Sequence, residues 1–389
     1  MPWRETDVVE ERTRFVLEYE SEEYTMAELC RFYGIARKTG YEWVSRYQAA
    51  GLPGLQDRRY GCGNHPNQIE EQISQQILQL KYKHPSWGAK KLRVYLWRKD
   101  KTVVWPAVST FGEILRRQGL SCPQRKRRRV PLYTQPFQQV EEANQLWCAD
   151  FKGWFRTGNG ERVDPLTISD AHSRYLLRCH CVEKTNTDQV QAIFTAAFRE
   201  YGLPLRIQTD NGAPFASRAI AGISRLSIYW IKLGIHPERI KPGCPEQNGR
   251  HERMHRTLKA ETAKPPAADP RAQQALFDRF RPEYNELRPH EALQQQTPAS
   301  CYQSSPRAYP ERVPEPEYGT HMKSRKVYPD GTFHWNNRQI FISKALGGER
   351  IGLEPVDERY WDVRFMSFAL GRLDTHTLAL QATAAAEQK

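Results

Sequence analysis

The chain has 389 residues and a mass of 45.3 kDa, more than one ordinary domain holds, so two to four domains are expected. Hydrophobic residues make up 39% of it, which excludes a chain that is disordered throughout. No run of about 18 apolar residues is present to form a transmembrane helix, and the N-terminus lacks the apolar stretch of a signal peptide. The eight cysteines are scattered without a CxxC pair, which predicts reduced thiols and neither a disulfide framework nor a zinc finger.

The positive charge is concentrated in one segment. The whole chain carries a net charge of +13, and residues 51–130 hold 17 basic against 5 acidic side chains. Such a concentration is typical of a face that binds a polyanion. A solvated surface that favours solubility is the alternative. The basic residues interleave with helical patterns and do not form a tail, which favours the first interpretation.

Residues 6–50 have the pattern of three short helices, at 6–19, 25–32 and 37–50. Thr25 and Glu28 form a capping box that opens the second helix. Gly34 lies in the tight turn between the last two helices, so the segment has the helix-turn-helix pattern of DNA-binding proteins. A three-helix bundle used for protein contacts is the alternative.

A second unit of the same kind follows a basic linker at 51–67. Helices are expected at 68–82, 89–99 and 108–118, and five consecutive basic residues close the unit, so that it spans 68–130 with its tail. Two such units in tandem favour binding to nucleic acid, with an affinity dominated by phosphate neutralisation. The candidate DNA contacts are Arg37, Lys38, Arg46, Arg58, Arg59, Lys90, Lys91, Arg93, Arg125, Lys126, Arg127, Arg128 and Arg129.

From about residue 140 strands alternate with helices. Strands are expected at 146–156, 163–170, 175–182 and 205–209, and helices at 187–201, 218–233 and 247–262, which together predict a mixed α/β domain over 140–264. A helix at 273–285 and a proline-rich connector fill 265–317. Short strands at 318–376 predict a small β-barrel. Residues 377–389 are expected to form a frayed tail. The fold class is multidomain α+β.

Three carboxylates in the α/β domain stand apart. Asp150 lies within the first strand, Asp210 follows a later strand, and Glu252 lies on the last helix. A carboxylate between Trp147 and Phe151 is costly to bury without a cation or a metal. Three hard oxygen ligands suit Mg²⁺, and two such ions about 3.5–4 Å apart catalyse phosphoryl transfer. Each residue also has an ordinary interpretation: a turn residue for Asp210, an ion pair for Asp150 and a solvated helix residue for Glu252.

The motifs around these carboxylates form a longer pattern. They are Trp147-x-x-Asp150, Ser169-Asp170-x-x-Ser173-Arg174, Thr209-Asp210-Asn211-Gly212-x-x-Phe215, and Lys241-Pro242-x-x-Pro245-x-x-Asn248-Gly249-x-x-Glu252-x-x-x-x-x-Leu258-Lys259. Residues 144–262 thus resemble the RNase H-like catalytic core of the retroviral integrases and bacterial insertion-sequence transposases, the DDE recombinases. No His/Cys zinc module precedes the core, which points to the bacterial branch.

The resemblance implies that Asp150, Asp210 and Glu252 are the catalytic, metal-binding triad, holding two Mg²⁺ ions for which Mn²⁺ substitutes. It also implies that Arg256 and Lys259 reach the DNA end. At about 100° per residue, both lie within roughly 40° of Glu252 around the helix. Pairing with acidic neighbours is the alternative for these two. Glu261 falls on the opposite face and is predicted to be dispensable.

The function implied is that of a DNA transposase. It would bind the terminal inverted repeats of double-stranded DNA, nick the ends to free 3′-OH groups and join them to target DNA. It would act as a homo-oligomer, at least a dimer, in the bacterial cytoplasm at the nucleoid, without a membrane partner. Two alternatives remain: a helix-turn-helix regulator with an inactive core, and a nuclease of this fold that does not join DNA.

Overall fold

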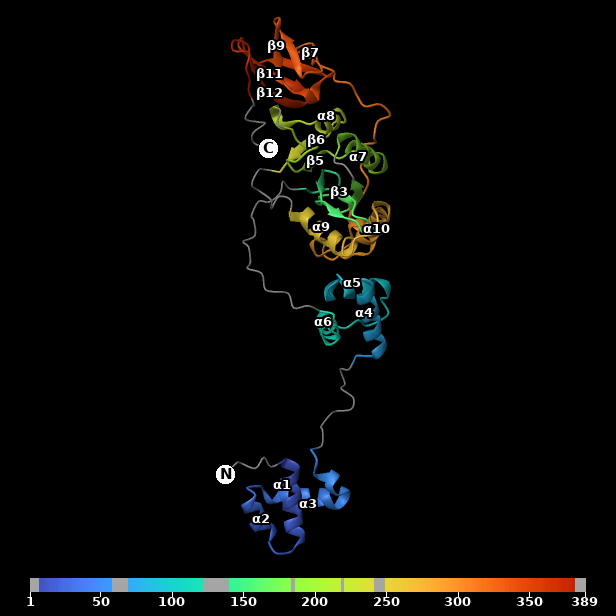
Figure 1. The fold of residues 1–389 in the computed structure, drawn as a ribbon, viewed down its shortest axis with the longest axis vertical. Helices are drawn as coiled ribbons and strands as arrows, with labels where there is room; N and C mark the ends of the chain where they lie inside the picture. Colours follow the sequence, from blue (N-terminus) through green and yellow to red (C-terminus); the bar gives the residue numbers. More distant parts are fainter. Residues whose placement is uncertain are drawn as a thin grey trace. The chain divides into compact units, whose positions relative to one another are not determined.

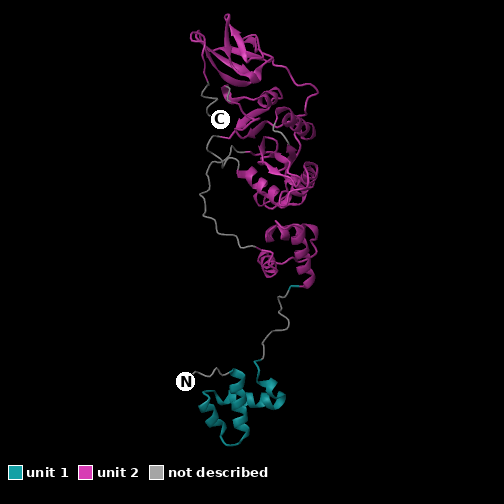
Figure 2. Cartoon of the chain, viewed as in Figure 1, with its two compact units in different colours: residues 1–69 teal, residues 70–389 magenta. Residues whose placement is uncertain are grey.

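The structure, a computed structural model, describes residues 7–57, 69–121, 140–182, 186–217, 220–240 and 249–381 (Figure 1). The chain divides into two compact units, residues 1–69 and residues 70–389 (Figure 2). Across those described ranges, no helix is both long and apolar enough to cross a membrane. The basic candidates Arg58, Arg59 and Arg125, Lys126, Arg127, Arg128, Arg129 lie outside the described residues.

The first unit contains the three predicted helices, α1 (Val8–Glu20), α2 (Met26–Phe32) and α3 (Arg37–Ala50), followed by the 3₁₀ turn η1 (Leu52–Leu55). The capping box between Thr25 and Glu28 is confirmed. Gly40 of α3 is needed because a Cβ there would lie 2.7 Å from Cys30 Sγ. The close approach of α2 and α3 buries an apolar core that includes Phe15, Val16, Leu29, Val44 and Leu55.

The second unit begins with three more helices, α4 (Glu71–Lys83), α5 (Ala89–Lys99) and α6 (Val108–Arg117), close to the predicted bounds. Their apolar stripes meet in a separate core built from Ile77, Trp87, Leu92, Leu96, Phe111 and Leu115. The short connections and the single shared core make these helices one helical subdomain of the second unit.

The α/β region is a six-stranded mixed sheet. Its strands are β1 (Leu146–Phe151), β2 (Phe155–Arg156), β3 (Arg162–Asp170), β4 (Leu176–Val182), β5 (Arg206–Thr209) and β6 (His236–Arg239). The order is β2-β3-β1-β5-β6, with β4 also paired to β3. β1, β5 and β6 run parallel, whereas β3 runs antiparallel to β1 and β4.

Two details of this sheet differ from the sequence prediction. The strand expected at 146–156 is broken after Phe151. β6 was not predicted, because His236-Pro237-Glu238-Arg239 shows neither alternation nor β-branched side chains.

Helices cover both faces of the sheet. α7 (Thr187–Tyr201) and α8 (Arg225–Lys232) pack on one face, through a core that includes Trp147, Ile168, Phe194, Phe198 and Trp230. α9 (Gly249–Thr262) and α10 (Pro270–Pro282) pack with the other face, where Met254, Leu258 and Phe277 join Leu176 and Cys179. The helix predicted at 218–233 is shorter, with the turn η2 (Ile220–Gly222) ahead of α8. A π-helical turn, η4 (Glu283–Leu287), extends α10 before η5 (Glu291–Leu293) and α11 (Pro298–Cys301).

The C-terminal region is an antiparallel sheet in the order β13-β12-β11-β10-β7, with a two-stranded β8–β9 pair. Its elements are β7 (Lys323–Lys326), β8 (Thr332–Trp335), β9 (Arg338–Phe341), η6 (Lys344–Leu346), β10 (Arg350–Pro355), β11 (Tyr360–Phe365), β12 (Phe368–Asp374) and β13 (Leu380–Gln381). Among the described strands, β13 and β7 form the two edges of the sheet and do not pair with each other. The sheet is therefore confirmed, but its closure into the predicted barrel is not shown. The frayed tail predicted from 377 is wrong for its first residues, because β13 pairs with β12.

Candidate active site and DNA-binding surface

Asp150 lies near the end of β1, and Asp210 directly follows β5, the parallel neighbour of β1. β1 and β5 pair with Leu146 opposite Arg206 and Cys148 opposite Gln208. Continued by two residues beyond Cys148 and Gln208, the same offset of 60 residues would bring Asp210, the first residue after β5, opposite Asp150. Adjacent strands lie about 4.8 Å apart, and equivalent positions point to one face of the sheet. The fold therefore places Asp150 and Asp210 towards the carboxyl ends of two neighbouring strands.

A tight turn fixes the Asp210 carboxylate. The Gly212 backbone N–H donates to Asp210 Oδ1 at 3.1 Å, and Asn211 Nδ2 donates to the Ile240 carbonyl at 2.8 Å. A Cβ on residue 212 would lie 3.0 Å from Asp210 Oδ2, so a side chain there would press on the carboxylate. The turn is thus anchored to the residue that follows β6, and its Gly212 N–H orients the Asp210 carboxylate.

Two buried histidines of α9 sit on the sheet beside Asp150. Thr167 is the cross-strand partner of Asp150, and its hydroxyl donates to the Asp150 carbonyl at 3.2 Å. The same oxygen lies 2.6 Å from His251 Nε2 and 2.7 Å from His255 Nε2. Both lone pairs of the hydroxyl are used when each ring carries its proton on Nε2. This contact fixes the first turn of α9, which carries Glu252, against the sheet face of Asp150.

Burial keeps both rings neutral. It lowers the pKa of His251 to about 4, and with a further contribution from His251 it lowers the pKa of His255 to about 2. Neither histidine was singled out from the sequence. Two histidines four residues apart on one helix face were the only available signal, and such spacing also occurs on solvated helices.

Glu252 lies in the first turn of α9 and is exposed. Among the residues described, no group of three or more His, Cys, Asp or Glu side chains is close enough to hold a metal ion. The pair Asp150 and Asp210 provides the hard oxygen donors that Mg²⁺ prefers, whereas Glu252 is not gathered with them. The preceding segment, 241–248, lies outside the described residues.

The orientation predicted for α9 is confirmed for its apolar side. Met254 and Leu258 are buried, at 5% and 1% exposure, and Arg256 and Lys259 are exposed together with Glu252. One open face of the helix therefore carries the Glu252 carboxylate and the positively charged side chains of Arg256 and Lys259. Arg256 and Lys259 are placed where a ligand can reach them.

The other basic candidates fall into two groups. Arg37 and Lys38 are exposed in the first turn of α3. Arg46 instead donates to the Gln56 carbonyl at 2.6 Å and stacks on Trp43, and Arg93 donates to the Pro106 carbonyl at 2.8 Å. These two side chains support their own units, a role that the sequence analysis did not predict.

Lys90 and Lys91 of α5 approach the core region of the second unit. Lys90 Nζ lies 3.4 Å from Glu291 Oε1, with both side chains largely exposed. Lys91 is half-buried, and burial followed by the positive charge of Arg288 lowers its pKa to about 8. The two candidate DNA contacts on this helix therefore differ in their surroundings.

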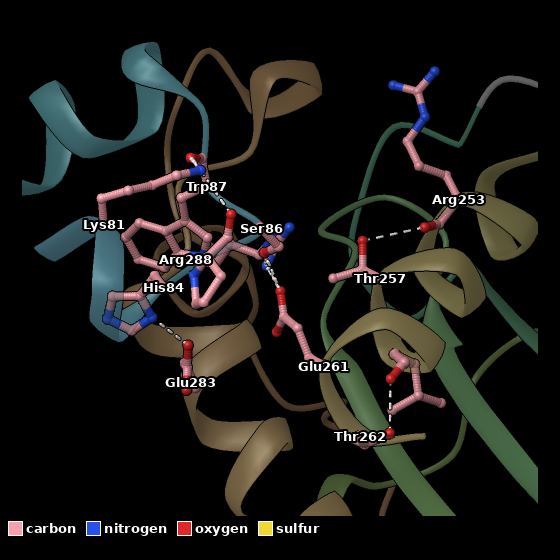
Figure 3. Close-up of polar contacts among 12 residues, drawn as sticks. Lys81, His84, Ser86, Trp87, Arg253, Thr257, Glu261, Thr262, Glu283 and Arg288 are labelled. Carbon is pink, nitrogen blue, oxygen red and sulfur yellow. Dashed lines mark hydrogen bonds and ion pairs between the residues drawn. The ribbon is translucent and has the colours of Figure 1, made fainter. Parts of the chain in front are cut away.

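The prediction that Glu261 is dispensable conflicts with its contacts. Its Oε1 lies 2.5 Å from Arg288 Nη1 and accepts a hydrogen bond from Ser86 Oγ (Figure 3). His84 Nδ1 lies 2.6 Å from Glu283 Oε1 in the same region. These contacts join the α4–α5 connection to α9 and η4. Helix geometry correctly predicted that Glu261 lies away from Glu252. It could not predict that Arg288 and Ser86 contact Glu261.

Comparison with protein families gives four matches. Residues 140–245 and 233–298 match two family models, each described as an integrase core domain. Residues 11–61 match a helix-turn-helix domain, and residues 39–115 match a homeodomain-like domain. The first two matches together include Asp150, Asp210 and Glu252.

The chain is also similar to proteins of bacterial insertion elements. The chain is 24% identical over 258 residues to an uncharacterized 31.7 kDa protein of insertion element IS407 from Burkholderia multivorans, covering 66% of this chain and 90% of that one. It is 27% identical over 234 residues to the transposase InsD for insertion element IS2A/D/F/H/I/K from Escherichia coli, covering 55% and 72%.

Two of the similar solved structures are catalytic core domains of integrases. The magnesium-bound catalytic core domain of HTLV-2 integrase in its trimeric form matches with 17% identity and a TM-score of 0.35, covering 42% of this chain and all of that one. The catalytic core domain of BIV integrase matches with 20% identity and a TM-score of 0.31, covering 41% and 93%.

Proposed function

We propose that this protein, which is related to the insertion-element transposases and has their integrase core domain behind helix-turn-helix domains, is a DDE-type DNA transposase. It binds terminal inverted repeats, nicks the transposon ends and joins the freed 3′-OH groups to target DNA. The observation that carries the proposal is that Asp150, near the end of β1, and Asp210, directly after β5, follow two adjacent parallel strands inside the matched core.

Asp150, Asp210 and Glu252 are the metal ligands in this proposal. Two Mg²⁺ ions, or Mn²⁺ in their place, would supply activation of the attacking oxygen and stabilisation of the leaving oxygen. Asp150 and Asp210 lie towards the carboxyl ends of β1 and β5, which are parallel neighbours in the sheet. Glu252, in the first turn of α9, is the third ligand in this proposal.

The reaction consists of two phosphoryl transfers. In the first, a water oxygen bonds to phosphorus at the transposon end and the 3′ oxygen leaves as a hydroxyl. In the second, that hydroxyl bonds to a target phosphorus and displaces the target's own 3′ oxygen. One phosphodiester bond forms for each that breaks in the second step, so no external energy source is required. Arg256 and Lys259 hold the DNA end on the open face of α9 while this happens.

Recognition of the ends is assigned to the helical units. Arg37 and Lys38 are exposed at the start of α3, the second helix of the helix-turn-helix pattern, where they can reach phosphates or base edges. The basic residues of the segments 58–59 and 125–129 would add phosphate contacts. Two transposon ends must be held together, so the active form is a homo-oligomer, at least a dimer.

The test is joining of a labelled duplex carrying the element's terminal repeat to a supercoiled plasmid, with purified full-length protein and Mg²⁺. A transposase gives label covalently attached to nicked or linear plasmid. Nicked plasmid without attached label would indicate a nuclease, and bound but unaltered DNA would indicate a regulator with an inactive core.

A further inference from the structure

A cationic pocket lies away from the proposed metal site. It has a volume of about 420 Å³ and is formed by α5, the β3–β4 turn, the start of α9 and the segment that follows α10. Five of the side chains that line it are positively charged, and none of the described lining residues is Asp or Glu. The five are Lys91, Arg174, Arg250, Arg253 and Arg288.

Such crowding of like charges is unfavourable in the absence of a counter-ion. Burial, and next the charge of Arg250, lowers the pKa of Arg174 to about 10, just as burial and Arg288 lower the pKa of Lys91. Glu261 neutralises Arg288 from outside the pocket. His290 also lines the pocket, and its buried Nε2 has no hydrogen-bond partner among the described residues. The described side chains that line the pocket thus carry an excess of positive charge.

The pocket and the candidate active site occupy different sides of α9. Around the helix, Arg253 lies about 100° and Arg250 about 160° from Glu252, whereas Arg256 and Lys259 lie within about 40° of it. The residues assigned to the DNA end are therefore not those that line the pocket. A ligand in the pocket would be held independently of the proposed metal site.

We propose that this pocket, where α5 meets the catalytic core, binds a backbone phosphate of duplex DNA. Guanidinium groups suit this ligand because each can donate two parallel hydrogen bonds to phosphate oxygens. Lys91 comes from a segment that matches a homeodomain-like domain, and the other four cations come from the core side. One bound strand therefore touches both parts. The identity of the DNA, although not the anion site itself, rests on the proposed function.

The test compares two charge-removing variants of the full-length protein. Arg253→Gln changes an exposed residue of the pocket, and Arg279→Gln is the matched control, because Arg279 is exposed on α10 and does not line the pocket. Fluorescence anisotropy with a short labelled duplex is measured over a range of salt concentrations. We expect Arg253→Gln to bind about fivefold more weakly and to lower the magnitude of the salt slope by about 1. Wild-type affinity and slope in Arg253→Gln would overturn the proposal.

A second arm distinguishes DNA from free phosphate. Inorganic pyrophosphate is added to the wild type and to Lys91→Gln, and the unfolding temperature is recorded. A rise in the wild type that Lys91→Gln loses, together with weaker duplex binding by Lys91→Gln, supports the DNA site. The same rise with unchanged duplex binding would mean that the pocket takes free phosphate compounds instead, and the proposal would be wrong.

The experiments give different outcomes if the pocket proposal is wrong and if the proposed function is wrong. Neither binding measurement requires catalysis. Weak duplex binding by Arg253→Gln, combined with a wild-type protein that joins no DNA, would reject the transposase assignment and keep the pocket. Normal duplex binding by Arg253→Gln, combined with an active wild type, would reject the pocket alone.

Discussion

Thr167 Oγ1 lies 2.6 Å from His251 Nε2, and through this contact a strand of the sheet holds the helix that carries Glu252. Thr167 is also the cross-strand partner of Asp150, so one hydroxyl lies between the two elements that supply proposed catalytic carboxylates. The histidines are thus positioning residues for α9.

Thr167→Val tests this role. The substitution keeps the shape but removes the acceptor of both histidines, and each buried donor left without a partner costs about 1–3 kcal/mol. We expect a lower unfolding midpoint and a larger loss of DNA joining than of DNA binding. Thr13→Val is the control, since the Thr13 hydroxyl donates to the carbonyl of Val9 within its own helix. Equal effects of the two substitutions would contradict the positioning role.

The sequence predicted most of this region, for identifiable reasons. The burial of Met254 and Leu258 follows from helical periodicity, and the capping box of Thr25 and Glu28 is a local signal. The Thr167–His251 contact joins residues 84 positions apart, and no local pattern encodes it. The Glu261–Arg288 ion pair was missed for the same reason, and β6 was missed because its polar residues are made a strand by pairing with β5.

The buried histidines predict how stability depends on pH. The folded protein has a His251 pKa of about 4, below the ordinary value of 6.5. The unfolded chain therefore binds more protons between these values, and stability is lost as pH falls from about 6.5 toward 4, at up to about 1.4 kcal/mol per pH unit for each such group. His251→Gln retains a donor without the titration. Denaturant unfolding at pH 7 and about pH 5 should show a smaller pH effect in this variant. An identical pH effect would show that His251 does not titrate in this way.

Glu261 is predicted to matter for stability. Arg288 has a side chain only 7% exposed, so Glu261→Gln leaves a nearly buried guanidinium without its anionic partner. We expect a loss of about 2 kcal/mol in unfolding free energy. Glu286→Gln, at an exposed position of η4, should cost far less. If the two variants unfold at the same denaturant concentration, the ion pair contributes nothing to stability.

The basic residues of α3 are predicted to have two different roles, in DNA binding and in stability. Replacing Arg37 and Lys38 together by Gln removes two exposed charges, and binding of duplex DNA should weaken without a change in unfolding temperature. Arg46→Gln should instead lower the unfolding temperature, because Arg46 stacks on Trp43 and binds the Gln56 carbonyl. The reverse outcome, with Arg46→Gln stable and the double variant unfolded, would contradict the assignment.

The central claim is that Asp150 and Asp210 act together in metal-dependent DNA joining. The direct measurement is strand transfer of a pre-cleaved transposon end by Asp150→Asn and Asp210→Asn in Mg²⁺, beside Asp188→Asn, a control at an exposed carboxylate of α7. We predict that both active-site variants bind the end normally yet lose joining by at least about a hundredfold, because each loses an anionic ligand, while the control joins normally. Near-normal joining by either Asp150→Asn or Asp210→Asn would contradict the account.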